Sequence, residues 1–314
     1  MSLLKINAVS DQPVLEDGAD LRAVLRENLT RLAPQAPVVV LIPGYKFSPH
    51  ARATIPHEHI LSLSPPKDCW KAISWPRHLG FGRGPRAEGL CIAFGWEARG
   101  SIWRAWNTAT KASLALAQLV DLIESIRPGP IDLISHSLGA RVALGSFRHL
   151  PAHSYGRAVL LSAAEYQSTA RAALHTECGR SAEVFNITSR ENDLFDWIIE
   201  WLVRGPCRGD QALGSGLGQQ MPNWLDIQVD DRATRWALQE FGYRIPRPDS
   251  RVSHWSAYLR PGLFAFYRDL IRARHDLPLA CLRHVLPQQN APRWSRLLRR
   301  PDWSLPFLGR SSMQ

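Results

Sequence analysis

Short, unbroken apolar runs alternate along this chain with longer stretches in which apolar residues recur every three or four positions. The clearest run is residues 38–42, Val-Val-Val-Leu-Ile, which has the composition of a strand buried on both faces of a parallel sheet. Similar runs occupy residues 90–94, 131–134, 158–161, 184–187 and 225–229. Helical spacing is found at residues 21–32, 103–126, 165–175, 232–241 and 263–271. This alternation predicts an α/β fold, with a mostly parallel sheet flanked by helices on both faces.

The sharpest transition in this pattern lies at residues 131–150. The apolar run 131–134 leads directly into Ser135-His136-Ser137-Leu138-Gly139, and helical spacing follows at once. In so tight a strand-to-helix turn the apex residue is strained, and the residues two before and two after it nearly touch, so both must be small. Gly139 meets this requirement, and Ser135 is the next smallest polar residue. An ordinary turn with an incidental serine is the alternative interpretation.

The stretch resembles the nucleophile elbow of the α/β-hydrolase superfamily, Gly-x-Ser-x-Gly, with Ser135 in place of the first glycine. The resemblance extends over roughly residues 37–275 and is to the superfamily rather than to one enzyme. It implies that Ser137 is the catalytic nucleophile. After the strand at 38–42 the chain reads Pro43-Gly44-Tyr45, where the superfamily commonly has His-Gly-x. By resemblance, the backbone N–H groups of Tyr45 and Leu138 would form the oxyanion hole.

A serine hydroxyl needs a base, and the base needs a group that holds its tautomer. In this superfamily the order along the chain is serine, acid, histidine. The strand near residues 184–188 is followed by Ser-Arg-Glu-Asn-Asp, which makes Asp193 the candidate acid. Asp196 and Glu191 remain open, and an N-cap role is the alternative for Asp193. The candidate base is His254, in the loop that precedes the amphipathic helix around residues 263–271.

Two further segments are expected near the site. Residues 49–88 form a long insertion between strands, rich in Pro, His, Trp and Gly, and we interpret it as an ordered cap over a pocket. Residues 194–202 are apolar apart from Asp196 and Glu200. They form either plain core or the wall that receives an acyl chain. The pair His57-x-His59 is not completed into a metal-binding set, so neither a metal nor an organic cofactor is expected.

Composition and charge set the remaining expectations. The 314 residues divide into an N-terminal helix and linker (1–36), the α/β core (37–275) and a C-terminal extension (276–314). The net charge of +10 comes mostly from arginines scattered along the chain, without the pattern of a nucleic-acid-binding module. Five dispersed cysteines, no secretory signal and no long apolar span favour a cytoplasmic protein. Nucleic acid is therefore not an expected partner, and the sequence does not indicate an oligomeric state.

The C-terminal extension combines arginines with aromatic and aliphatic residues. From residue 281 onward, one acid, Asp302, stands against six arginines: Arg283, Arg293, Arg296, Arg299, Arg300 and Arg310. This mixture is typical of segments that lie at membrane interfaces. We predict a weak peripheral contact with anionic membranes, while packing of the aromatics against the domain is the favoured alternative.

Together these patterns predict a serine hydrolase of the α/β-hydrolase type. It would cleave an acyl ester or thioester with Ser137, His254 and Asp193 through an acyl-enzyme intermediate. Two alternatives stay open from the sequence. One is acyl transfer to an acceptor other than water, and the other is a non-catalytic α/β-hydrolase domain that serves as a binding or scaffold module.

Overall fold

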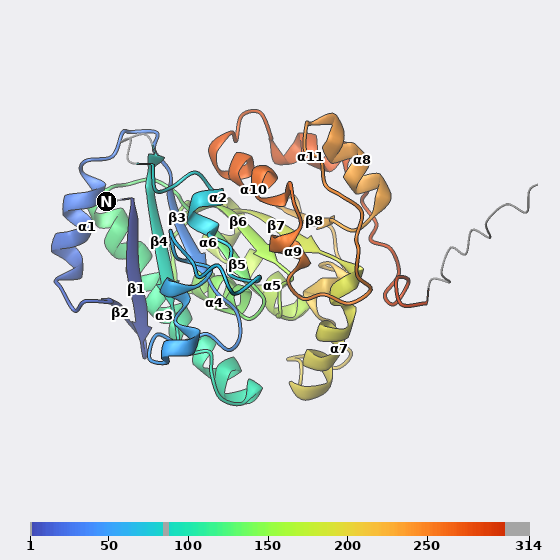
Figure 1. Cartoon of the computed structure of the whole chain (residues 1–314), viewed down its shortest axis with the longest axis horizontal. Coiled ribbons are helices and arrows are strands. Elements are labelled where there is room, and N and C mark those ends of the chain that lie inside the picture. Colours follow the sequence, from blue (N-terminus) through green and yellow to red (C-terminus); the bar gives the residue numbers. More distant parts are fainter. Residues whose placement is uncertain (1, 84–87, 299–314) are drawn as a thin grey trace, which may run out of the picture.

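The computed structural model of the chain describes residues 2–83 and 88–298. Within these residues, eight strands form one sheet in the order β2-β1-β4-β3-β5-β6-β7-β8 (Figure 1). The strands are β1 (Leu3–Val9), β2 (Gln12–Leu15), β3 (Val38–Ile42), β4 (Leu90–Gly95), β5 (Ile131–His136), β6 (Tyr155–Leu161), β7 (Glu183–Thr188) and β8 (Trp224–Gln228). All neighbours run parallel except β1 and β2, which pair antiparallel at one edge. The predicted mostly parallel sheet is confirmed.

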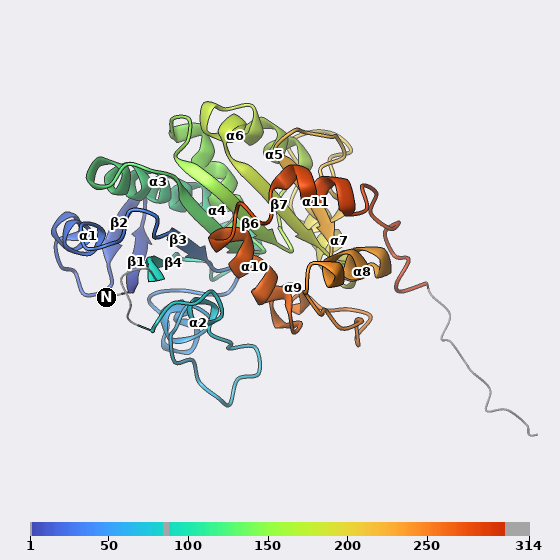
Figure 2. The same ribbon diagram turned by 90° about the horizontal axis from the view of Figure 1, so that it is seen from above.

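Helices cover both faces of this sheet, as Figure 2 shows in a view from above. One face packs against α1 (Leu21–Leu29), α3 (Ile102–Ile126), α4 (Gly139–Ser146), α5 (Gln167–Leu174) and α6 (Glu177–Ser181). The other packs against α2 (Trp75–His78), α8 (Arg232–Glu240), α9 (Ser256–Leu259), α10 (Leu263–Arg272) and α11 (Leu279–Val285). The remaining helix, α7 (Asp193–Leu202), follows directly after β7. The expected α/β architecture is therefore present.

The central strand β3 shows why the sequence forms such a sheet. Successive side chains of a strand point to opposite faces. Val38, Val40 and Ile42 accordingly belong to the core under α1 and α3, while Val39 and Leu41 belong to the core under α2 and α10. Because both faces are covered, every position of the strand is buried, and an uninterrupted apolar run is the result.

The N-terminal residues contribute more to the fold than the sequence predicted. The expected helix is present as α1, but residues 3–15 form the β1–β2 hairpin, which joins the sheet beside β4. Polar residues within β1 hide its strand pattern. Lys5 forms an ion pair of 2.9 Å with Glu16 of the adjoining segment, and buried Asn7 forms a hydrogen bond of 2.7 Å with His57. These polar side chains have partners that only the folded chain provides.

The insertion after β3 is partly core and partly cavity lining. Trp75 and Phe81 are fully buried. The Trp75 ring packs 5.3 Å from that of Tyr258 in α9, so this part of the insertion is bound to the C-terminal helices. Trp70 is 67% exposed and makes an edge contact with Trp255. The aromatic residues of the insertion thus have different environments.

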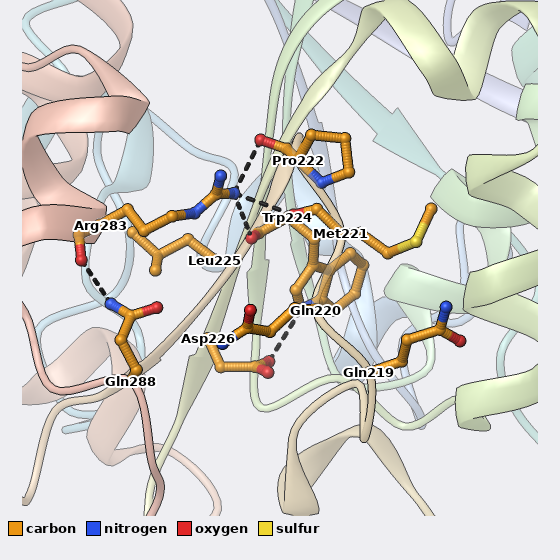
Figure 3. Close-up of a pocket in the computed structure, with 9 residues that line it drawn as sticks. All are labelled: Gln219, Gln220, Met221, Pro222, Trp224, Leu225, Asp226, Arg283 and Gln288. Carbon is orange, nitrogen blue, oxygen red and sulfur yellow. Dashed lines mark hydrogen bonds between the residues drawn. The ribbon is translucent and has the colours of Figure 1, made fainter.

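The C-terminal extension is anchored to β8 through α11. The guanidinium of Arg283 donates hydrogen bonds of 2.7–2.9 Å to the backbone carbonyls of Met221, Pro222 and Trp224, at the rim of a shallow cavity (Figure 3). With its guanidinium committed to these carbonyls, Arg283 serves to hold the extension against the sheet.

Two further arginines of the extension also contact the domain. Arg293 lies 2.8 Å from the carboxylate of Glu200 in α7, and Arg296 donates to the carbonyl of Ser250 at 2.8 Å. In these contacts it is the arginines, rather than the aromatic residues of the packing interpretation, that bind the domain. The rest of its arginines lie within residues 299–314, outside the described residues, and membrane contact stays a prediction.

Candidate active site

Ser137 occupies the turn between the end of β5 and the start of α4. Its backbone has φ 52°, in the left-handed region that is strained for any residue except glycine. The Ser137 N–H donates to the Leu161 carbonyl of β6 at 2.9 Å, which ties the turn to the sheet. A Cβ atom at Gly139 would lie 2.6 Å from the Pro43 carbonyl oxygen. Glycine at position 139 is therefore a steric requirement of packing α4 against the end of β3.

The other small residues around the turn have different reasons to be small. Ser135, in the position of the first motif glycine, is fully buried, and its hydroxyl has no hydrogen-bond partner within the described residues. On the neighbouring loop, a Cβ atom at Gly44 would lie 2.8 Å from Cβ of Ser137. Gly44 thus allows the loop after β3 to lie directly against the serine.

The two backbone N–H groups predicted for the oxyanion hole both belong to residues at the Ser137 cavity. Tyr45 and Leu138 line it together with the serine. Neither N–H group donates a hydrogen bond to another residue in the described parts of the chain. Tyr45 is held in place by its hydroxyl, which donates to the Gly100 carbonyl at 2.6 Å. Neither N–H group is therefore committed to another described residue.

His254 lines the same cavity as Ser137. Its Nδ1 lies 2.6 Å from Oδ1 of Asn192, and its ring centroid is 4.7 Å from that of His136. Burial lowers the pKa of His254 well below 6.5, and the nearby His136 and Lys71 lower it further. The imidazole is thus held neutral, as a general base must be. Within the described residues no hydrogen bond joins His254 to the Ser137 hydroxyl.

The structure does not bring Asp193, the acid expected from the sequence, to His254. Asp193 is completely buried as the first residue of α7. One of its oxygens accepts a hydrogen bond of 2.7 Å from the Trp294 N–H, and the other lies 3.3 Å from the Arg190 guanidinium. Its contacts therefore join α7 to the C-terminal extension.

The two alternative acids likewise form no hydrogen bond with His254 within the described residues. Glu191 forms a buried ion pair with Arg260. The buried Asp196 accepts a hydrogen bond of 2.9 Å from the Asn192 side-chain amide. Among the described residues that follow β7, it is Asn192 that forms a hydrogen bond with the imidazole, and the sequence analysis missed it because only carboxylates were considered there. Its place directly before Asp193 was the available signal.

The cavity beside Ser137 has a volume of about 660 Å³. Four residues of its apolar wall come from α7: Phe195, Ile198, Ile199 and Leu202. Other residues of that wall include Leu138, Ile102, Phe47, Trp255 and Tyr258. Apolar residues from the segment 194–202 therefore line the cavity. From the insertion, Ala53, Thr54, His59 and Lys71 reach the cavity.

Lys46 and Lys71 line this cavity, and Lys71 has the closer contact with an aromatic ring. The Lys71 ammonium lies 3.3 Å from the ring centroid of Trp255, a cation–π contact.

The cavity of Figure 3, about 290 Å³ in volume, shares no lining residue with the Ser137 cavity. In the described parts of the chain, no three His, Cys, Asp or Glu side chains are grouped to hold a metal ion. No helix there is both long and apolar enough to cross a membrane.

Comparisons with known proteins yield only distant structural likeness. No protein-family model matches the chain, and no curated protein does. The crystal structure of the Bacillus licheniformis lipase BlEst2 in its propeptide form matches with 12% identity and a TM-score of 0.40, covering 83% of this chain and 53% of that one. The mature form matches with 11% identity and a TM-score of 0.33, covering 63% of this chain and 84% of that one. The chain thus spans about half the length of the propeptide form.

Proposed function

We propose that this protein is a serine hydrolase that cleaves an acyl ester or thioester, with Ser137 as nucleophile and His254 as general base. One observation carries the proposal: a serine in a strained strand-to-helix turn shares a cavity with a neutral histidine whose Nδ1 is fixed by Asn192. Asn192 orients the imidazole of His254, the role for which the sequence suggested Asp193. An asparagine performs the same task for the catalytic histidine of papain-like proteases.

The hydrogen-bond partner of His254 determines which of its nitrogens is basic. The Asn192 oxygen accepts a hydrogen from Nδ1, so the lone pair lies on Nε2. Nε2 takes the proton of the Ser137 hydroxyl as the oxygen attacks the acyl carbonyl carbon. The same nitrogen then gives that proton to the departing alcohol or thiol, which leaves the acyl group on Ser137. Water attacks this acyl-enzyme by the same proton transfers and releases the carboxylic acid.

Charge develops on the substrate carbonyl oxygen in both steps. The free N–H groups of Tyr45 and Leu138 are the donors that would receive it. An acyl chain would lie against the apolar α7 wall. The absence of a Ser137–His254 hydrogen bond without substrate is compatible with this chemistry, because such bonds often tighten only in the substrate complex.

Turnover of short- and long-chain esters and thioesters tests the proposal. Ser137→Ala should lower kcat by about six orders of magnitude, the typical loss when the nucleophile of a serine triad is removed. Ser135→Ala is the matched control, because it removes a buried hydroxyl that has no partner within the described residues. Turnover that survives in Ser137→Ala, or that is lost equally in Ser135→Ala, would contradict the proposal. A wild-type protein that turns over no member of the panel would favour the non-catalytic alternative.

A further inference from the structure

An asparagine is an ambiguous partner for a catalytic histidine. Its side-chain amide has an acceptor at one end and a donor at the other. If the oxygen faces Nδ1, the imidazole keeps its hydrogen there and Nε2 can accept the serine proton. If the amide nitrogen faces Nδ1, the hydrogen moves to Nε2, and the base is disabled. In a serine protease triad this wrong tautomer lowers kcat by about 10⁴.

Asp196 resolves this ambiguity. It lies one helical turn after Asn192, and its Oδ1 accepts a hydrogen bond of 2.9 Å from the Asn192 amide nitrogen. An ionised carboxylate only accepts hydrogen bonds, and in the neutral acid a proton on the unpartnered Oδ2 leaves Oδ1 as an acceptor. In either state the nitrogen points to Asp196 and the oxygen to His254. We propose that Asp196 is a positioning residue, which sets the His254 tautomer by fixing the orientation of the Asn192 amide. This inference rests on the proposed function of Ser137 and His254.

The surroundings of Asp196 support a dedicated role for this carboxylate. Asp196 is 2% exposed. Within the described residues, the bond from Asn192 is the one hydrogen bond to its side chain, and Oδ2 has no partner. A buried carboxylate with so few partners is costly to the fold. Its hydrogen bond is with Asn192, the same residue whose side chain bonds to the candidate base.

The carboxylate also has little freedom to move. A Cβ atom at Gly214 would lie 1.8 Å from Oδ2 of Asp196, so the loop at 213–215 closes over it and glycine is required there. The charged groups that act on Asp196 are Arg190 and Arg293, which favour its ionised form, and Asp193, which opposes it. The geometry therefore holds one carboxylate oxygen against the Asn192 amide.

The direct test is the tautomer of His254 in Asp196→Asn. We expect ¹⁵N NMR of histidine-labelled wild-type protein to show Nδ1 protonated, with the His254 signals assigned by comparison with His254→Gln. In Asp196→Asn the Nε2-protonated form should appear. A variant that keeps the wild-type tautomer would overturn the inference. This readout requires no catalytic turnover, so it remains decisive even if the proposed ester hydrolysis is wrong.

A rescue experiment separates positioning from a structural role. In Asp196→Asn we expect kcat to fall by between about tenfold and about 10⁴, the latter being the loss for a fully reversed tautomer, with KM changing much less. The double variant Asn192→Asp/Asp196→Asn places a carboxylate directly on Nδ1, which fixes the tautomer without Asp196, and should recover most of the lost kcat. Loss of kcat without this recovery, in a double variant that melts as the wild type does, would show that Asp196 acts in another way.

Discussion

Replacing Asp196 by asparagine should stabilise the protein, and increasingly so as the pH rises. Burial raises the pKa of the Asp196 carboxyl from 3.8 to about 7; Arg190 and Arg293 oppose the shift and Asp193 adds to it. A raised pKa means that the folded state holds the proton more tightly than the unfolded chain does. The stability associated with this proton is fully present below about pH 3.8 and is lost as the pH rises toward 7. Asparagine has the same shape and carries no charge at any pH.

The size of the effect follows from the shift. At about 1.4 kcal/mol per pKa unit, the ionised Asp196 lowers the free energy of unfolding by about 4 kcal/mol at pH 8. At pH 5 the folded state keeps its proton, but the carboxyl group of the unfolded chain, with its pKa of 3.8, is mostly ionised. This difference lowers the free energy of unfolding by about 1.7 kcal/mol. The stability advantage of Asp196→Asn over the wild type should therefore grow by about 2.5 kcal/mol between pH 5 and pH 8.

Urea unfolding of both proteins at the two pH values measures this difference. Taking the change between pH values removes any constant contribution from packing of the new amide. Asp249→Asn makes the same chemical change at an exposed site and serves as the control. An advantage that is equal at pH 5 and pH 8 would show that burial does not raise the pKa of Asp196. The predicted combination of higher stability and lower kcat is the trade-off expected at a functional site.

Three further predictions follow from the site. Gly44→Ala should lower kcat by about 100-fold, because its new Cβ would lie 2.8 Å from Cβ of Ser137 and displace the serine; unchanged steady-state kinetics would contradict the tight approach of this loop. Trp75→Ala should lower the free energy of unfolding by about 3–5 kcal/mol. Trp70→Ala removes an exposed ring that contacts the cavity-lining Trp255, so it should change chain-length preference among esters and leave the urea midpoint nearly unchanged. Since the pKa of His254 lies well below 6.5, fluorophosphonate labelling should persist at pH 6 and fall only in more acidic buffer; a loss of labelling centred above pH 6.5 would contradict a buried, neutral base.

Much of the fold follows from local pattern, because buried parallel strands require apolar side chains on both faces. Residues 38–42 are the clear case. β1 was missed for the opposite reason, since Lys5 and Asn7 interrupt its apolar pattern. Lys5 pairs with Glu16 only once the β1–β2 hairpin has formed, and the partner of Asn7, His57, belongs to the insertion. The apolar pattern alone therefore does not indicate that these polar residues fit into a strand.

The candidate site was predictable to the extent that it depends on where strands end. Ser137 and His254 both follow from the order of elements, and the structure brings them to one cavity. The orienting group depends on the single turn Arg190–Asn192 between β7 and α7, which decides which of two adjacent side chains faces the imidazole. Asp193 faces the interior, and Asn192 faces His254. A difference of one residue in such a turn is beyond what spacing can resolve.

In the proposed function, Ser137 is a nucleophile activated by His254. The most direct measurement is to treat the protein with a fluorophosphonate, digest it and locate the adduct by mass spectrometry. We expect a single modified residue, Ser137. Labelling should be abolished in Ser137→Ala, strongly slowed in His254→Gln and retained in Ser135→Ala. An adduct on another residue, or labelling at the wild-type rate in His254→Gln, would contradict it.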